Sequence, residues 1–213
     1  MKIIITESQY KLLTEREDEK NIQEVDEIYD LFVDKINAHN NYVQSRGDIK
    51  VLQVRLDTKF GELFIFLRSD SNGNAGGEYR LPTVISPSPI IIIYDCYFIG
   101  EDVLFLHKVK TIQHEIVHFI DDRKKRIKPI KVSKYETNPL GYHNDTHEIN
   151  AEFIAIINQI IIRGDTFNTF AEFLKLFIEY DEMTIKQFAY LTDKNRKSLI
   201  NRLYQYYTNL KKK

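Results

Sequence analysis

The sequence predicts a globular α+β protein, and three observations lead to this class. Short runs rich in β-branched and aromatic residues fill the stretch between residues 51 and 94. Segments with apolar residues at every third or fourth position, typical of amphipathic helices, precede and follow that stretch. A chain of 213 residues with 43% hydrophobic side chains can also bury one sizeable core. We therefore expect a small twisted sheet with helices packed around it.

The first 45 residues form the N-terminal helical segment of the prediction. Thr6 is expected to cap a first helix that frays near Lys20. Apolar residues at helical spacing between Ile22 and Ile36 predict a second helix that ends near Asn40. Residues 46–213 are assigned to the main domain, and we expect the whole chain to fold as one compact unit.

The β-rich part begins with two runs, residues 51–56 and 63–67, which predict a hairpin. Three glycines between residues 70 and 77 predict a loop that leads into an edge strand at residues 78–81. The five apolar or aromatic residues from 90 to 94 predict a central strand that is buried on both faces.

The remaining residues predict helices. Apolar positions recur at helical spacing from Asp102 to Ile120, and a basic run with a proline ends this helix. A polar connection from 131 to 145 leads to a strongly apolar helix over about 146–162, which stops at Gly164. Three further helices are expected from about residue 165, over 166–180, 184–191 and 193–211.

Charge and composition exclude several classes of protein. With 30 Lys and Arg against 31 Asp and Glu, the chain lacks the basic excess typical of nucleic-acid binding, so no nucleic-acid partner is expected. The single cysteine, Cys96, forms no intramolecular disulfide and is expected to be a small buried hydrophobic side chain in a strand. No apolar stretch approaches the ~20 residues of a membrane span, and no secretory signal is visible. We expect a cytoplasmic protein without a membrane partner.

One sequence motif carries the chemistry of the prediction. His114-Glu115-Ile116-Val117-His118 lies in a predicted helix, where residues four apart share a face, so the two imidazoles can bind one metal ion. Glu148 and Glu152, again one turn apart on the next predicted helix, offer a carboxylate as a third ligand. Two imidazoles and one carboxylate leave the fourth tetrahedral position open for water.

The spacing of these residues resembles that of a known family. His-Glu-x-x-His-x-x-Asp over residues 114–121, followed by Glu-x-x-Ala-Glu over 148–152, resembles the gluzincin metallopeptidases, with the lethal-factor-type branch the most similar. The resemblance covers about residues 90–162. It implies a zincin-like fold in which His114, His118 and Glu148 hold one Zn²⁺ per chain and Glu115 is the general base.

The resemblance implies further roles around the metal. Asp121 and Glu152 would orient the imidazole ligands. Because such peptidases often place a Tyr or His from the connecting region over the metal, we expect Tyr142 to be a catalytic oxyanion donor, with Tyr135 as its rival. The substrate would be a peptide or protein. Its extended chain would bind the edge strand through the main chain of Gly77 and Tyr79.

Other histidines and motifs support weaker interpretations. The metzincin pattern is excluded because it requires Gly at position 121 and His at position 124, where this chain has Asp121 and Lys124. His147 precedes Glu148 and points about 100° away from it, which favours an orienting or surface role. His107 is expected on a helix surface.

The sequence therefore predicts a zinc-dependent metallopeptidase with helical extensions at both ends. The leading alternative is a non-catalytic structural or interaction protein whose metal site is closed by a fourth ligand, such as His143 or Asp145. A weaker alternative is hydrolysis of a non-peptide amide. The first ten residues also resemble the starts of uncharacterised proteins of tailed bacteriophages, which would imply a role in the host cytoplasm or in the virion.

Overall fold

The computed structural model describes residues 7–38, 42–46, 48–70, 76–84, 86–99, 102–124 and 138–212. The chain divides into two compact units. Residues 25–130 form one, the sheet unit; residues 1–24 and 131–213 form the other, the helical unit. The boundary that we expected near residue 45 falls inside the sheet unit. The predicted α+β class is confirmed, since the described residues contain both a mixed sheet and long helices.

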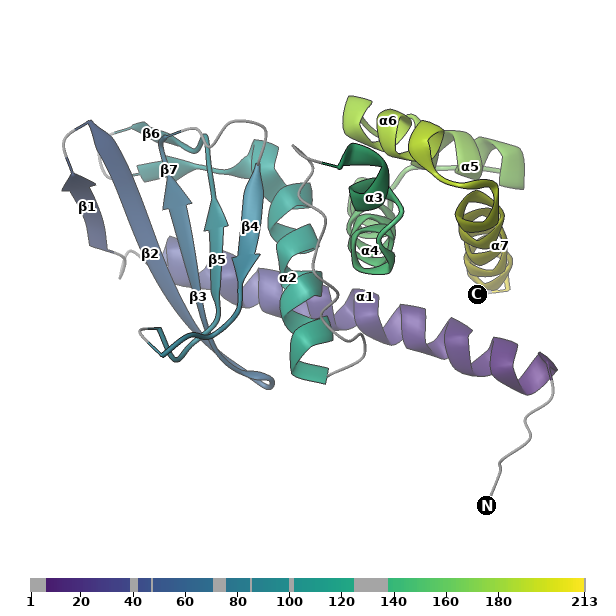
Figure 1. The fold of residues 1–213 in the computed structure, drawn as a ribbon, viewed down its shortest axis with the longest axis horizontal. Coiled ribbons are helices and arrows are strands. Elements are labelled where there is room, and N and C mark those ends of the chain that lie inside the picture. Colours follow the sequence, from purple (N-terminus) through teal and green to yellow (C-terminus); the bar gives the residue numbers. More distant parts are fainter. Residues whose placement is uncertain are drawn as a thin grey trace, which may run out of the picture. The chain divides into compact units, whose positions relative to one another are not determined.

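Helix α1 (Glu7–Asn37) is a single continuous helix, where the sequence pattern predicted two (Figure 1). No glycine or proline interrupts these residues, so nothing in the backbone forces a break near Lys20. The predicted cap Thr6 lies outside the described residues. The division between the two units falls within this helix, between Glu24 and Val25.

The sheet has five strands in the order β1-β2-β3-β5-β4. Its strands are β1 (Tyr42–Arg46), β2 (Ile49–Thr58), β3 (Gly61–Arg68), β4 (Gly77–Arg80) and β5 (Ile90–Ile93). Strand β5 lies between β3, to which it is parallel, and β4, to which it is antiparallel. The predicted hairpin, central strand and edge strand are therefore confirmed as β2–β3, β5 and β4.

The hairpin turn shows how the local sequence sets this register. Thr58 pairs with Gly61 at the end of the β2–β3 ladder. The Thr58 hydroxyl donates to the Gly61 carbonyl over 2.7 Å and accepts the Phe60 amide over 3.1 Å. Gly61 has φ of 109°, a value that favours glycine, so the sequence Thr-Lys-Phe-Gly fixes the turn.

One face of the sheet carries the core of the sheet unit. Alternate residues of β2 and β3 are buried, which is the period of a strand with one covered face. Helix α2 (Val109–Lys124) packs beside β4 and β5 (Figure 1). The core contains Leu52, Val54, Leu56, Leu63, Ile65, Leu67, Ile91, Ile93, Ile112, Ile116, Phe119 and Ile120.

The stretch before α2 differs from the prediction. Residues Asp102–Leu104 form strand β7, which pairs with β6 (Tyr97–Ile99), and a 3₁₀ turn at Leu106–Lys108 separates β7 from the helix. The prediction of a helix from Asp102 was therefore wrong by about two turns. Cys96 is buried as predicted but lies between β5 and β6, because Asp95 adopts a φ of 55° that ends the extended chain.

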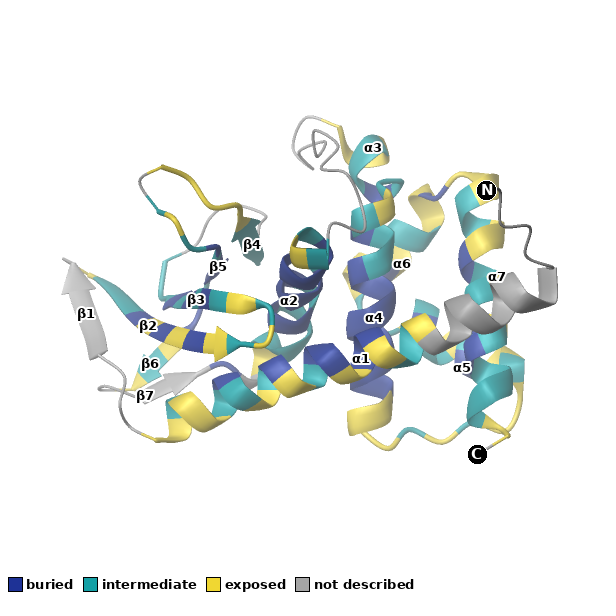
Figure 2. Ribbon diagram, turned by 90° about the horizontal axis from the view of Figure 1, so that it is seen from below, coloured by how far each residue is buried: buried dark blue, intermediate teal, exposed yellow. Residues whose placement is uncertain are grey.

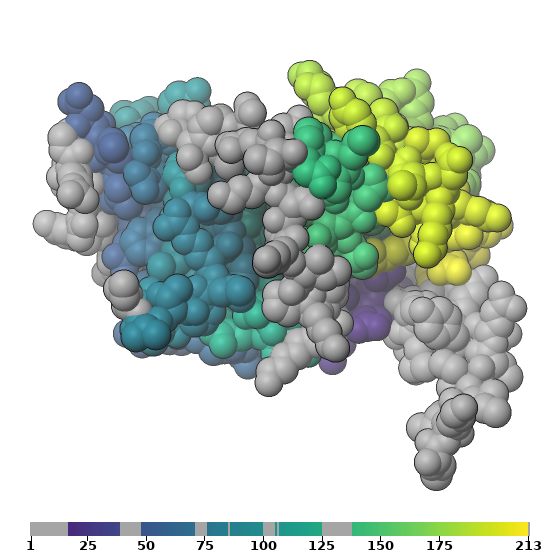
Figure 3. Space-filling view, viewed as in Figure 1, coloured from purple at the N-terminus to yellow at the C-terminus, as the bar shows by residue number. Residues whose placement is uncertain are grey.

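The helical unit is built around α4 (Thr146–Ile162), whose residues 151–160 are all buried (Figure 2). Its predicted end is confirmed at Gly164, which has φ of 65°. The other helices are α3 (Pro139–His143), α5 (Phe170–Ile178), α6 (Glu182–Tyr190) and α7 (Asp193–Leu210). In Figure 3 the C-terminal residues, in shades of yellow, lie beside the green residues of α3 and α4.

None of the described helices is both long enough and apolar enough to cross a membrane.

Candidate metal centre

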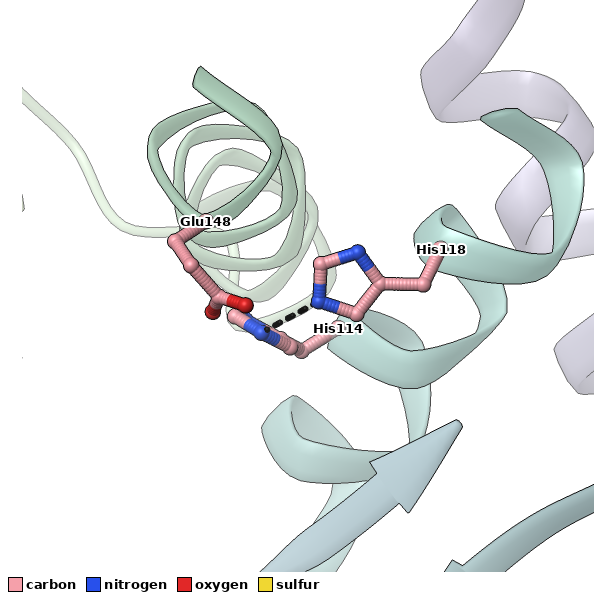
Figure 4. Close-up of side chains that lie close together, drawn as sticks. All are labelled: His114, His118 and Glu148. Atoms are coloured by element: carbon pink, nitrogen blue, oxygen red, sulfur yellow. Dashed lines mark hydrogen bonds between the residues drawn. The ribbon is translucent and has the colours of Figure 1, made fainter. Parts of the chain in front are cut away.

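His114 and His118 lie one turn apart on α2, inside the sheet unit. Their Nε2 atoms are 3.1 Å apart, as the dashed line in Figure 4 shows, and their ring centroids are 4.8 Å apart. Both side chains are half-buried. The helical spacing that we read from the sequence therefore brings the two ring nitrogens to one point at the helix surface.

This separation fits a shared metal ion. Imidazole nitrogens bind zinc at about 2.0–2.1 Å, so two of them at a tetrahedral angle lie about 3.3 Å apart. The observed 3.1 Å is close to that value. The pair needs little rearrangement to act as two ligands of one ion.

Glu115 packs close to the edge strand β4. Its side chain is buried, and its Cγ atom would lie 3.1 Å from a Cβ atom added at Gly77 of β4. Such a Cβ would also lie 2.9 Å from Cγ2 of Thr111, one turn earlier on α2. The absence of a side chain at Gly77 therefore leaves the space in which the Glu115 side chain packs against β4.

Strand β4 presents main-chain groups on the side away from β5. The Gly76 carbonyl accepts the Tyr94 amide over 3.0 Å, and Gly77 is the neighbouring partner of Ile93. Because the main-chain groups of successive strand residues point to opposite sides, those of Gly77 and Tyr79 are turned away from β5. Among the described strands, β4 has a neighbour on one side only.

The Tyr79 side chain makes its contacts within the sheet unit. Its hydroxyl donates to Oδ2 of Asp122 on α2 over 2.9 Å, and its ring packs against Phe119. Burial, together with this hydrogen bond to a carboxylate, raises the pKa of Tyr79. Any contact of Tyr79 with a substrate would therefore be made by its main chain.

Glu148 is positioned by the start of α4 in the helical unit. Asp145 is the N-cap residue, and its side chain accepts the His147 amide over 2.8 Å. Glu148 lies in the first turn, where the helix dipole favours an ionised carboxylate, and it is only 5% exposed. Figure 4 draws its side chain on that helix.

Glu152 follows one turn later and is also buried. Its Oε1 accepts a hydrogen bond of 2.9 Å from the hydroxyl of Thr184 on α6. His143 of α3 is buried and its ring stacks on Tyr190 at 5.2 Å. Burial lowers the pKa of His143, although the charges of Glu152 and Glu148 act in the opposite direction.

The remaining predicted residues lie near these elements. Asp121 is buried on α2, three residues after His118. Tyr142 is half-buried on α3, with its ring 5.5 Å from that of His143. Tyr135 lies outside the described residues. The sequence analysis missed Thr184, because no spacing or motif links it to a glutamate 32 residues earlier.

The structure thus brings His114, Glu115 and His118 together with Gly77 in the sheet unit. It brings the two glutamates of α4 together with Thr184 in the helical unit. The fold and these side chains define an α+β protein with a candidate metal centre. Comparisons with known protein families, with curated proteins and with solved structures find no match for this chain.

Proposed function

We propose that the protein is a zinc-dependent peptidase in which His114, His118 and Glu148 hold one zinc ion. The observation that carries the proposal is the pair of converging imidazoles with a buried Glu115 beside it. In support, each of the three proposed ligands offers one ligand atom of a kind that binds zinc. Two imidazoles and a carboxylate are the ligand set of catalytic zinc, which keeps a fourth position open.

Zinc held by His114, His118 and Glu148 would supply a water of lowered pKa and would polarise a carbonyl oxygen. Glu115 is the general base of the proposal and accepts a proton from the attacking water. Glu115 directly follows His114 in α2 and is not one of the three proposed ligands. The same carboxyl group then donates the proton to the leaving amine.

The substrate of the proposal is an extended peptide that adds a strand to β4. The main-chain groups of Gly77 and Tyr79 face away from β5, which is the arrangement that strand addition requires. Glu115 packs directly against Gly77, so a peptide on this edge would lie next to the proposed base. Peptide hydrolysis is therefore favoured over hydrolysis of a small amide.

We further propose Tyr142 as the donor that stabilises the developing oxyanion. In support, the ring of Tyr142 is half-buried against His143, which limits the orientations open to its hydroxyl. Replacement by Phe removes only the hydroxyl and should lower kcat by about 10²- to 10³-fold with little change in KM.

Glu115→Gln in the zinc-loaded protein tests the proposed function. Hydrolysis of a peptide library should fall by a factor of about 10² to 10⁴, because amide nitrogen cannot replace carboxylate as a base. Zinc content should not change. Glu62→Gln is the matched control, since Glu62 lies in β3 beside Arg55, and it should retain full activity. Full hydrolysis by zinc-loaded Glu115→Gln would contradict the proposed role. Zinc binding without hydrolysis by the unaltered protein would favour a structural site.

A further inference from the structure

Helix α6 begins with a buried hydroxyl. Thr184 is the α6 residue that is fully buried, at 1% exposure, although the neighbouring side chains Met183 and Ile185 are exposed. A threonine whose only role is to cap the start of a helix can lie at the surface, as the N-cap residues Thr169 and Thr192 do. The burial of Thr184 therefore needs another explanation.

The hydroxyl of Thr184 lies between two carboxylates. Its Oγ1 is 2.9 Å from Oε1 of Glu152 and 2.8 Å from Oδ1 of Asp181. The same Oδ1 of Asp181 accepts the Thr184 amide over 2.7 Å, so Asp181 already has a donor as the N-cap. A hydroxyl has one proton and so donates one hydrogen bond. The Thr184 hydroxyl can give it to Glu152, because the Thr184 amide already donates to Asp181.

Glu152 shares a face of α4 with Glu148. Residues four apart on a helix are neighbours, and both carboxylates are buried. A carboxylate held by a hydroxyl from another helix loses the freedom to rotate, and buried groups that support ligands in this way orient them. The bond from Thr184 thus fixes the carboxylate next to a proposed ligand.

A second set of hydrogen bonds holds the start of α4 to the C-terminal helices. The Asn144 side chain donates to the Tyr190 carbonyl over 2.9 Å and accepts the Thr192 amide over 2.7 Å. The Asn195 side-chain amide donates to Asn144 Oδ1 over 3.0 Å. Helix α6 is therefore tied to the α3–α4 junction at its C-terminal end and to Glu152 near its N-terminal end.

We propose that Thr184 is a positioning residue of the metal centre. Its hydroxyl holds the carboxylate of Glu152, and Glu152 in turn holds the face of α4 that also carries Glu148. This inference rests on the proposed function, because it requires that Glu148 binds the metal. It gives the C-terminal helices, which had no chemical role in the sequence analysis, a part in ligand geometry.

The test compares Thr184→Val, which removes the hydroxyl but keeps the shape, with Thr184→Ser, which restores it. Zinc affinity is measured by chelator competition, and the visible spectrum of the Co²⁺-loaded protein reports coordination geometry. Thr184→Val should bind zinc about 10- to 100-fold more weakly and change the Co²⁺ spectrum. Thr184→Ser should restore both properties.

Thr169→Val is the matched control, because it also removes a threonine hydroxyl in the same unit, one that accepts the Glu172 amide as the N-cap of α5. It should lower the thermal midpoint without changing zinc affinity. Equal zinc affinity and an unchanged Co²⁺ spectrum in Thr184→Val would overturn the inference and leave the proposed function standing. A protein that binds no zinc in any form would overturn both.

Discussion

At the scale of single residues, Gly77 makes room for the proposed base. A methyl group at this position would lie 3.1 Å from Cγ of Glu115 and 2.9 Å from Cγ2 of Thr111. The nearer atom belongs to a β-branched side chain, which has little freedom to move away. The position of Glu115 therefore depends on a glycine in a different element.

Gly77→Ala should lower kcat/KM for peptide hydrolysis by about tenfold or more, because the Glu115 carboxylate is displaced. Zinc content should remain about one per chain. Gly76→Ala is the control: its Cβ would lie 3.6 Å from the nearest atom, an ordinary contact, and activity should be retained. Equal activity of the two variants would show that the close approach at Gly77 has no role in catalysis.

Cys96 gives a pH-dependent prediction. Burial raises the pKa of its thiol from 9.0 to about 11, so about one thiol in a thousand is ionised at pH 8. A raised thiol pKa favours folding below pH 9, and this contribution is lost as the pH rises from 9 through 11. The thiol should resist alkylation at pH 8 until urea unfolds the protein. Rapid alkylation of the folded protein would contradict the burial of Cys96.

Short-range spacing predicted most residues of the candidate site. The His114–His118 pair and the two glutamates of α4 follow from i, i+4 spacing, and Glu115 follows from its place next to His114; neither argument needs tertiary structure. Thr184 and the close approach at Gly77 follow from contacts between elements that are distant in sequence. No single-sequence pattern encodes such contacts.

At the scale of elements, regular patterns predicted strands β2 to β5 and helix α4 correctly, but they missed β1 and divided α1 into two helices. The alternation in β2 and β3 and the glycine after α4 gave clear signals. The error before α2 arose because Val103, Leu106 and Val109 also fit helical spacing. In the structure, pairing of β7 with β6 takes precedence over that weak local preference.

Asn144 is the residue through which the α3–α4 junction contacts α6 and α7. Asn144→Ala should lower the free energy of unfolding by about 1–3 kcal/mol, because Tyr190, Thr192 and Asn195 each lose a hydrogen bond. Urea denaturation measures this loss. Asn201→Ala, at an exposed position of α7, should change stability by less than about 0.5 kcal/mol. Similar small effects in both variants would contradict the proposed anchoring by Asn144.

At the scale of the whole molecule, the chain consists of two units, and the proposed ligands come from both. His114 and His118 belong to the sheet unit and Glu148 to the helical unit. The sequence did not reveal this division, because it falls within one uninterrupted helix, α1, where no change of composition marks it. The spacing of apolar residues along the sequence indicates local secondary structure, but it does not indicate which elements pack together.

A metal bound by the proposed ligands should stabilise the folded chain. Zinc at about a hundred times its dissociation constant should add about 2.7 kcal/mol, which a chelator should remove. Differential scanning calorimetry should show this difference in the unaltered protein and lose it in Glu148→Ala. The same zinc-dependent stabilisation in Glu148→Ala would contradict the role of that carboxylate.

The central claim is that His114 and His118 hold a zinc ion beside Glu115. Zinc per chain, measured by elemental mass spectrometry after zinc is supplied, tests it most directly. We predict about one zinc in the unaltered protein and in His107→Ala, whose histidine is exposed ahead of α2, and none in His118→Ala. No zinc in the unaltered protein, or equal zinc in His118→Ala, would contradict the account.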